Sequence, residues 1–150
     1  MKKVLALLLA LVMVFSLTAC GGAKLSAGSY KLTKMIADGE EQDTDYIQQL
    51  AAEGVFFAAL VINDDKTAAL KMFGEDDEKL TFDGKQFTAD NGDKINYTVD
   101  GDNITLKDSS TSMIFKKMTD AEKKEFDNPK SDEELTNIMI KVLQDMGALE

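Results

Sequence analysis

The side chains that could do chemistry in this 150-residue chain are carboxylates, lysines, serines, tyrosines and a single cysteine, Cys20. The sequence contains no histidine and no arginine. Catalytic triads and metal sites built on imidazole are therefore excluded. The guanidinium fork that holds phosphate or carboxylate as a bidentate pair is excluded as well. Oxygen ligands, amines and aromatic surfaces remain.

The N-terminal segment has the pattern of a removable targeting signal. Lys2 and Lys3 precede an apolar run at residues 4–15, which is shorter than the roughly 20 residues that span a bilayer. The run leads to Leu17-Thr18-Ala19-Cys20, which resembles the lipobox of bacterial lipoproteins. In that family the cysteine sulfur receives a diacylglyceryl group, and cleavage makes the cysteine the mature N-terminus. The resemblance implies a signal peptide at residues 1–19 and a domain anchored to the cell membrane through Cys20, on its extracytoplasmic side.

Residues 20–27 comprise the cysteine expected to carry the lipid and a short tether. The residues of the tether are mostly small, which predicts that it is flexible. Loss of the leader removes two lysines and takes the net charge from −10 to −12. Such a charge excludes nucleic acid as a natural partner, because binding of nucleic acid rests on basic contacts. It also opposes contact of the domain with anionic lipid headgroups.

Residues 28–118 predict short strands separated by turns. A first strand is expected at 29–36 and an apolar one at 55–62. Alternating apolar residues indicate further strands at 68–72, 80–82, around Phe87, and at 95–99, 104–106 and 113–115. Asp-Gly and Asn-Gly dipeptides between them supply the positive φ angles of tight hairpins. Sequential strands at this spacing predict an antiparallel meander that closes, or nearly closes, into a barrel.

Helices are expected beside this meander. Residues 43–53 predict a short helix with Asp43 or Thr44 as N-cap and Gly54 as its end. Two capping-box patterns, which begin at Thr119 and Ser131, predict helices within residues 119–150. The last helix carries an apolar stripe at Leu135, Ile138, Met139, Val142, Leu143 and Met146. Because such a stripe must be covered, we expect this helix to dock on the outer face of strand 55–62.

The order of these motifs resembles the lipocalin-like architecture, and in particular the small lipocalin-like lipoproteins of Gram-positive gut bacteria. The matching features are Gly28-Ser29-Tyr30, Asp38-Gly39, the strand 55–62, the turn 63–66, the segment 97–106 and Met113-Ile114-Phe115. The resemblance implies a mainly β fold, with a meander closing into a lipocalin-like barrel. It places one short helix between the first two strands and packs the C-terminal amphipathic helix on the barrel. Families of this kind mostly have no assigned activity.

A barrel of this kind offers its aromatic interior as a candidate site for an apolar ligand. The residues that would line such a site are Tyr30, Phe57, Phe73, Phe82, Phe87, Tyr97 and Phe115. The alternative is that these side chains simply fill the core of a small barrel.

Other chemistry finds weaker support in the sequence. Acidic turns such as 75–78 and 90–93 are rich in oxygen ligands, but none has the spacing of a calcium-binding loop, and no metal or cofactor is predicted. Ser109, Ser110 and Ser112 near Lys107 are better explained by a polar hairpin than by a serine–lysine dyad. We therefore expect no catalysis. Two functions stay open: a binding module for a small apolar molecule or envelope component, and a structural or interaction lipoprotein with a filled barrel that contacts an envelope protein.

Overall fold

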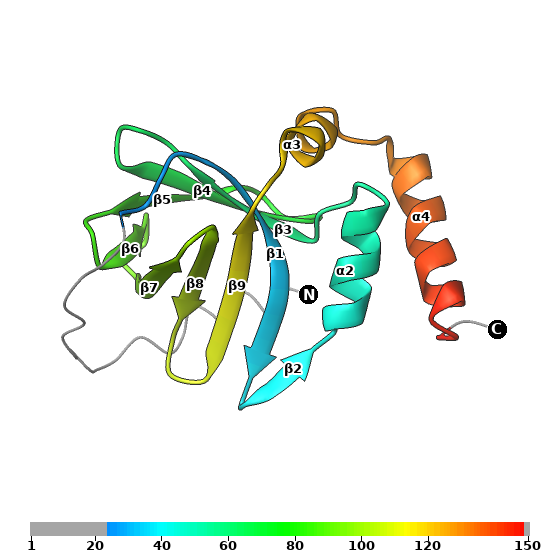
Figure 1. Cartoon of the computed structure of the whole chain (residues 1–150), viewed down its shortest axis with the longest axis horizontal. Helices are drawn as coiled ribbons and strands as arrows, with labels where there is room; N and C mark the ends of the chain where they lie inside the picture. The colour runs from blue at the N-terminus through cyan, green and yellow to red at the C-terminus, as the bar shows by residue number, and fades with distance from the viewer. Residues whose placement is uncertain (1–23, 149–150) are drawn as a thin grey trace.

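The structure, a computed structural model that describes residues 24–148, is a closed antiparallel barrel of eight strands with helices on one side (Figure 1). The barrel strands are β1 (Gly28–Ala37), β3 (Ala58–Ile62), β4 (Thr67–Met72), β5 (Glu78–Phe82), β6 (Gln86–Ala89), β7 (Lys94–Asp100), β8 (Asn103–Lys107) and β9 (Thr111–Lys117). Each strand pairs with the next along the chain, and β1 also pairs with β9. The predicted meander and its closure are confirmed.

The period-two alternation of apolar side chains decides which face of each strand lies inside. In β8, for example, Ile104 and Leu106 are buried in the core, whereas Lys107 is exposed. The same alternation runs through β4, where Ala68 and Leu70 are buried. A single apolar cluster with contributions from all eight barrel strands results. Burial of this cluster is the main favourable contribution to folding.

β1 joins the two edges of the sheet. Its residues 28–31 pair with β3, and its residues 30–37 pair with β9. The register with β9 shifts between Leu32 and Lys34, and the Thr33 hydroxyl there donates a 3.0 Å hydrogen bond to a carbonyl oxygen of β9. Irregularities of this kind bend a strand and increase its twist. The bend lets one long strand serve both edges.

A short strand that the sequence did not predict follows β1. In the turn between them, Asp38 and Gly39 both have positive φ, at 52° and 84°, as a two-residue hairpin turn requires. The chain then pairs back on the end of β1 as β2 (Glu40–Gln42). Its three residues are all polar and carry no apolar alternation, so the sequence pattern contains no signal for this strand.

The predicted short helix is α2 (Thr44–Ala52). Asp43 occupies the N-cap position, but its φ is 46° and its side chain makes no capping hydrogen bond. A capping side chain requires an extended backbone at this position, which Asp43 lacks. Gly54, with φ of 72°, follows the helix as predicted, since a left-handed residue is the usual helix end.

Two further helices follow the barrel. α3 (Asp120–Asp127) and α4 (Asp132–Asp145) both begin with the capping boxes that the sequence predicts. In each box the Thr119 or Ser131 hydroxyl accepts a hydrogen bond from the backbone N–H three residues on. The backbone N–H of the cap residue in turn donates one to the carboxylate of that glutamate, Glu122 or Glu134. Phe126 of α3 packs edge-on against Phe56, with ring centroids 6.0 Å apart.

The apolar stripe of α4 is covered chiefly by α2. Val142 is 2% exposed and packs with Leu50 of α2 and with Val55. The half-buried side chains around this cluster are Tyr46, Leu135, Ile138 and Met139. The predicted docking along the outer face of strand 55–62 is therefore corrected, because β3 begins at Ala58 and only Val55 of that range belongs to the cluster. α2 has apolar residues on two sides, so Ile47 joins the barrel core while Leu50 faces α4.

This arrangement predicts that Val142→Asp destabilises the protein severely. A buried, unpaired carboxylate in the small α2–α4 cluster should lower the free energy of unfolding by about 3 kcal/mol or more. Ile140→Asp is the matched control, since Ile140 lies on the same helix and is 43% exposed. Thermal unfolding followed by circular dichroism measures both. Equal melting temperatures for the two variants would contradict the docking of α4.

Candidate functional site

The barrel interior is the candidate site that the sequence predicts. Tyr30, Phe87 and Phe115 are buried in its core. Phe57, Phe82 and Tyr97 are half-buried and pack against that core. The structure thus brings six of the seven predicted aromatic residues together. Phe73 lies apart with 37% of its surface exposed, because it follows the end of β4, where the alternation stops.

The aromatic rings of β5, β6 and β7 are packed on one another. The ring centroid of Phe87 lies 5.6 Å from that of Phe82 and 4.9 Å from that of Tyr97. Both separations are those of direct aromatic contact. Phe87 and Phe115 have no exposed surface. Each ring therefore has other side chains as its packing partners.

Tyr97 is partly shielded from water by the side chains around it. Burial, and then the negative charge of Asp83, raises the pKa of its phenol above the usual value. The phenol is therefore neutral at physiological pH. It offers packing surface and a hydroxyl group rather than a nucleophile.

Leu25 and Ser26 belong to the barrel, although the sequence predicts them as part of a tether. Leu25 is 8% exposed and joins the core cluster. The Tyr30 hydroxyl donates a 2.9 Å hydrogen bond to the Ser26 carbonyl, and it lies 3.1 Å from the Ser26 hydroxyl. The packed domain therefore begins before Gly28. One leucine among small residues is too weak a signal to have predicted this from the sequence.

A small hollow lies at the barrel end where β4 leads into β5. Leu70 and Met72 form its apolar wall, and Glu75, Asp76 and Glu78 form its acidic wall. Its volume is about 10 Å³, which is room for about one water molecule. A hollow of this size does not accommodate an apolar molecule of lipid dimensions.

Glu78 is the residue of this hollow with a perturbed acidity. Burial is the main cause that raises the pKa of its carboxyl, and the charges of Asp93 and Asp90 add to the effect. The loop between β4 and β5 and the turn between β6 and β7 therefore lie close together at this end of the barrel. Sequence reasoning missed Glu78 as a distinct group, because one more carboxylate in an acidic run carries no signal of burial.

The acidic turns use their carboxylates to hold the backbone. Asp83 Oδ1 accepts hydrogen bonds from the backbone N–H groups of Lys85 and Gln86, at 2.9 and 3.0 Å. Asp108 Oδ1 does the same for Ser110 and Thr111, at 2.8 and 2.7 Å. Such contacts are the usual work of aspartate in turns. The serine-rich hairpin is thus accounted for by turn geometry.

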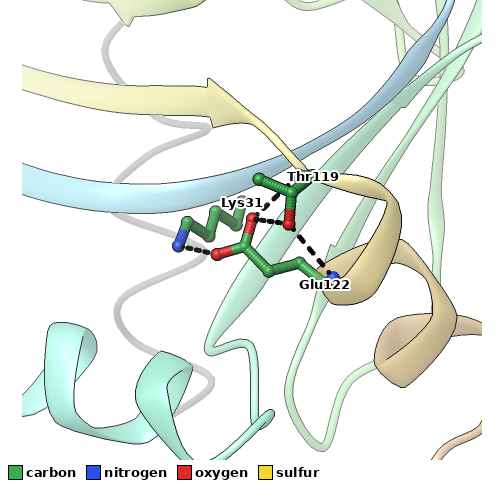
Figure 2. A network of polar contacts seen from close by, with 3 residues as sticks. All are labelled: Lys31, Thr119 and Glu122. Carbon is green, nitrogen blue, oxygen red and sulfur yellow. Dashed lines mark hydrogen bonds and ion pairs between the residues drawn. The ribbon is translucent and has the colours of Figure 1, made fainter.

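A polar network joins the barrel to α3 (Figure 2). Lys31 of β1 donates a hydrogen bond to Glu122 Oε1 and forms an ion pair with it. The other carboxylate oxygen accepts a 2.9 Å bond from the backbone N–H of Thr119, within the capping box of α3. Both charged side chains are largely covered, with exposed fractions of 18% for Lys31 and 26% for Glu122.

The network keeps Glu122 ionised. Burial acts to raise the pKa of Glu122, but the hydrogen bond from Lys31 and the bonds from Thr119 outweigh burial, so the pKa lies below its usual value. The arrangement fastens the start of α3 to the barrel wall.

Within residues 24–148, no group of three or more acidic or cysteine side chains is arranged to hold a metal ion. Over the same residues, none of the helices has both the length and the apolar character to cross a bilayer. Cys20 and the predicted signal peptide at 1–19 lie outside the described residues.

The chain matches no protein-family model, no curated protein and no solved structure.

The raised pKa of Glu78 predicts a pH-dependent effect of Glu78→Gln. The fold favours the protonated carboxyl, so the stability contributed by Glu78 is present below its ordinary pKa of 4.5 and is lost as the pH rises through the folded value. Glutamine removes that loss. We expect Glu78→Gln to raise the melting temperature at pH 7 and to lose this advantage as the pH approaches 4.5. Glu40→Gln, at an exposed site on β2, is the control. A lower melting temperature for Glu78→Gln at pH 7 would contradict the effect.

The joint at α3 predicts that Glu122→Ala is destabilising. The variant loses both the capping-box carboxylate and the ion pair with Lys31, at a cost of about 1–2 kcal/mol in unfolding free energy. Asp127→Ala provides the comparison, because Asp127 pairs with Lys123 on the same helix with both side chains half exposed. Urea unfolding of the two variants should show the larger loss for Glu122→Ala. Losses of equal size would mean that the joint adds nothing beyond a surface pair.

Proposed function

We propose that this chain is a lipid-anchored extracytoplasmic lipoprotein whose barrel is a non-catalytic interaction module with a filled interior. The proposal combines the anchor predicted from Leu17-Thr18-Ala19-Cys20 with a domain that contacts an envelope protein through its outer surface. The observation that carries the second part is the mutual packing of Phe82, Phe87 and Tyr97 on the barrel core.

The interior supports an interaction module over a carrier for an apolar molecule. A carrier needs an apolar cavity of some hundreds of cubic ångströms. Three of the rings proposed to line such a cavity, those of Phe82, Phe87 and Tyr97, pack on one another, and the hollow at the β4–β5 end is about 10 Å³. Phe115 and Phe87 are fully buried, so their side chains fill part of the space that a ligand would need.

The polar groups support a non-catalytic role. The carboxylates of Asp83 and Asp108 are engaged by turn backbones, and that of Glu122 is engaged by Lys31. Glu78 has a raised pKa, but it lies in a hollow with room for about one water molecule. General acid–base catalysis needs a group within hydrogen-bond reach of a bound substrate, and this hollow gives a substrate no room.

Native mass spectrometry of the full chain, expressed in a bacterium and released from membranes with a mild detergent, tests the proposal. We expect the mass of a chain that begins at Cys20 and carries a diacylglyceryl group, without a further apolar adduct. Cys20→Ser is the matched control and should lack the lipid and separate into the aqueous phase. An unmodified cysteine would overturn the anchor. A bound mass of a few hundred daltons that survives desolvation would overturn the filled interaction module in favour of a carrier.

A further inference from the structure

The two ends of the barrel differ in their connections and in their charge. One end, named here the near end, carries the turns 63–66, 83–85 and 101–102, together with the start of β1. The other, the far end, carries the connections 38–39, 73–77, 90–93 and 108–110. Strand direction alternates around the meander, so this division follows from the order of the strands.

The start of the described chain is held at the near end. Gly28 pairs with Ile62 beside the turn 63–66. Three residues before Gly28, Leu25 is buried in the barrel core, and the Ser26 carbonyl accepts a hydrogen bond from Tyr30. In the view of Figure 1 the first described residues, coloured blue, run from β1 towards β5 and β6. The segment before β1 is therefore packed against the barrel at its near end.

The remaining distance to the predicted anchor is short. Four peptide units separate Cys20 from Lys24, and they span at most about 15 Å. β1 has ten residues. The other barrel strands have four to seven residues. At 3.3 Å per residue and the usual strand tilt, the two barrel ends therefore lie about 10 Å apart along β6 and about 25 Å apart along β1. A lipid on Cys20 thus holds the near end within reach of the headgroups, while the far end lies one strand length beyond it.

Charge acts in the same direction. The four far-end connections contain seven acidic residues and no lysine. The three near-end turns contain four acidic residues and two lysines, and Lys24 is exposed beside them. The raised pKa of Glu78 beside Asp90 and Asp93 reflects this crowding of negative charge at the far end. An anionic leaflet repels the far end more strongly than the near end.

We infer that the near end of the barrel faces the lipid surface, and that the acidic far end points away from the membrane. This orientation rests on the lipid anchor proposed above. In this orientation the turns 63–66, 83–85 and 101–102 face the lipid headgroups. It also leaves the far-end loops as the part of the barrel that an envelope protein meets first.

Energy transfer from single labelled sites tests the orientation. Asp64→Cys and Asp102→Cys mark the near end, and Asp76→Cys and Asp90→Cys mark the far end; all four positions are exposed and undergo the same substitution. Cys20 is the single natural cysteine, and its sulfur is blocked once it carries the lipid. Each full-length lipoprotein variant is labelled with a maleimide donor fluorophore and reconstituted into phosphatidylcholine vesicles that carry a headgroup-linked acceptor.

We expect the transfer efficiency to be at least about twofold higher at the two near-end sites, because β4 and β7 place the far-end sites about 15–18 Å further along the barrel. Addition of phosphatidylglycerol should preserve this order. Equal or reversed efficiencies, in protein whose intact mass shows the diacylglyceryl group, would overturn the orientation and leave the anchor in place. An intact mass without the lipid would overturn the anchor, and the orientation with it.

Discussion

The structure depends on the pairing of one strand with two partners. β1 is hydrogen-bonded to β3 through its first residues and to β9 along most of its length, and a register shift near Thr33 lets it bend between them. Without that double pairing, the meander would be an open sheet with two exposed edges, which are sites of non-native association. Closure encloses one apolar face, and so determines that the side chains of one parity on every strand meet in a common core.

A small closed barrel then has little space to spare. Phe87 and Phe115 lie in its core without exposed surface, and Leu25 joins them from the segment that precedes β1. Packing of this kind resembles the interior of an organic crystal, where each group needs a neighbour. It also explains why the helices lie outside. Ile47 reaches the core from α2, whereas α4 packs against the opposite side of α2.

The sequence predicted which aromatic residues lie inside the barrel, but not whether they enclose a cavity. The sequence pattern identified the inward aromatic residues, because alternation determines the face of a strand. It placed Phe73 with them, since a residue one step past a strand end carries the same apolar signal. Whether six rings enclose a cavity or contact one another depends on barrel radius and side-chain rotamers, which no local pattern encodes. The ion pair between Lys31 and Glu122 connects residues 91 positions apart, so it could not be predicted from the sequence pattern either.

The sequence by itself determined the elements: the strand meander with its turn dipeptides, both capping boxes, the helix end at Gly54 and the lipobox-like segment that ends at Cys20. These features depend on residues within a few positions of one another, where backbone sterics and local hydrogen bonds act. The tertiary structure alone decided that β2 pairs back on β1, that α4 rests on α2, and that Leu25 belongs to the core. Each of these depends on which surfaces barrel closure leaves uncovered, and that is a property of the whole chain in space.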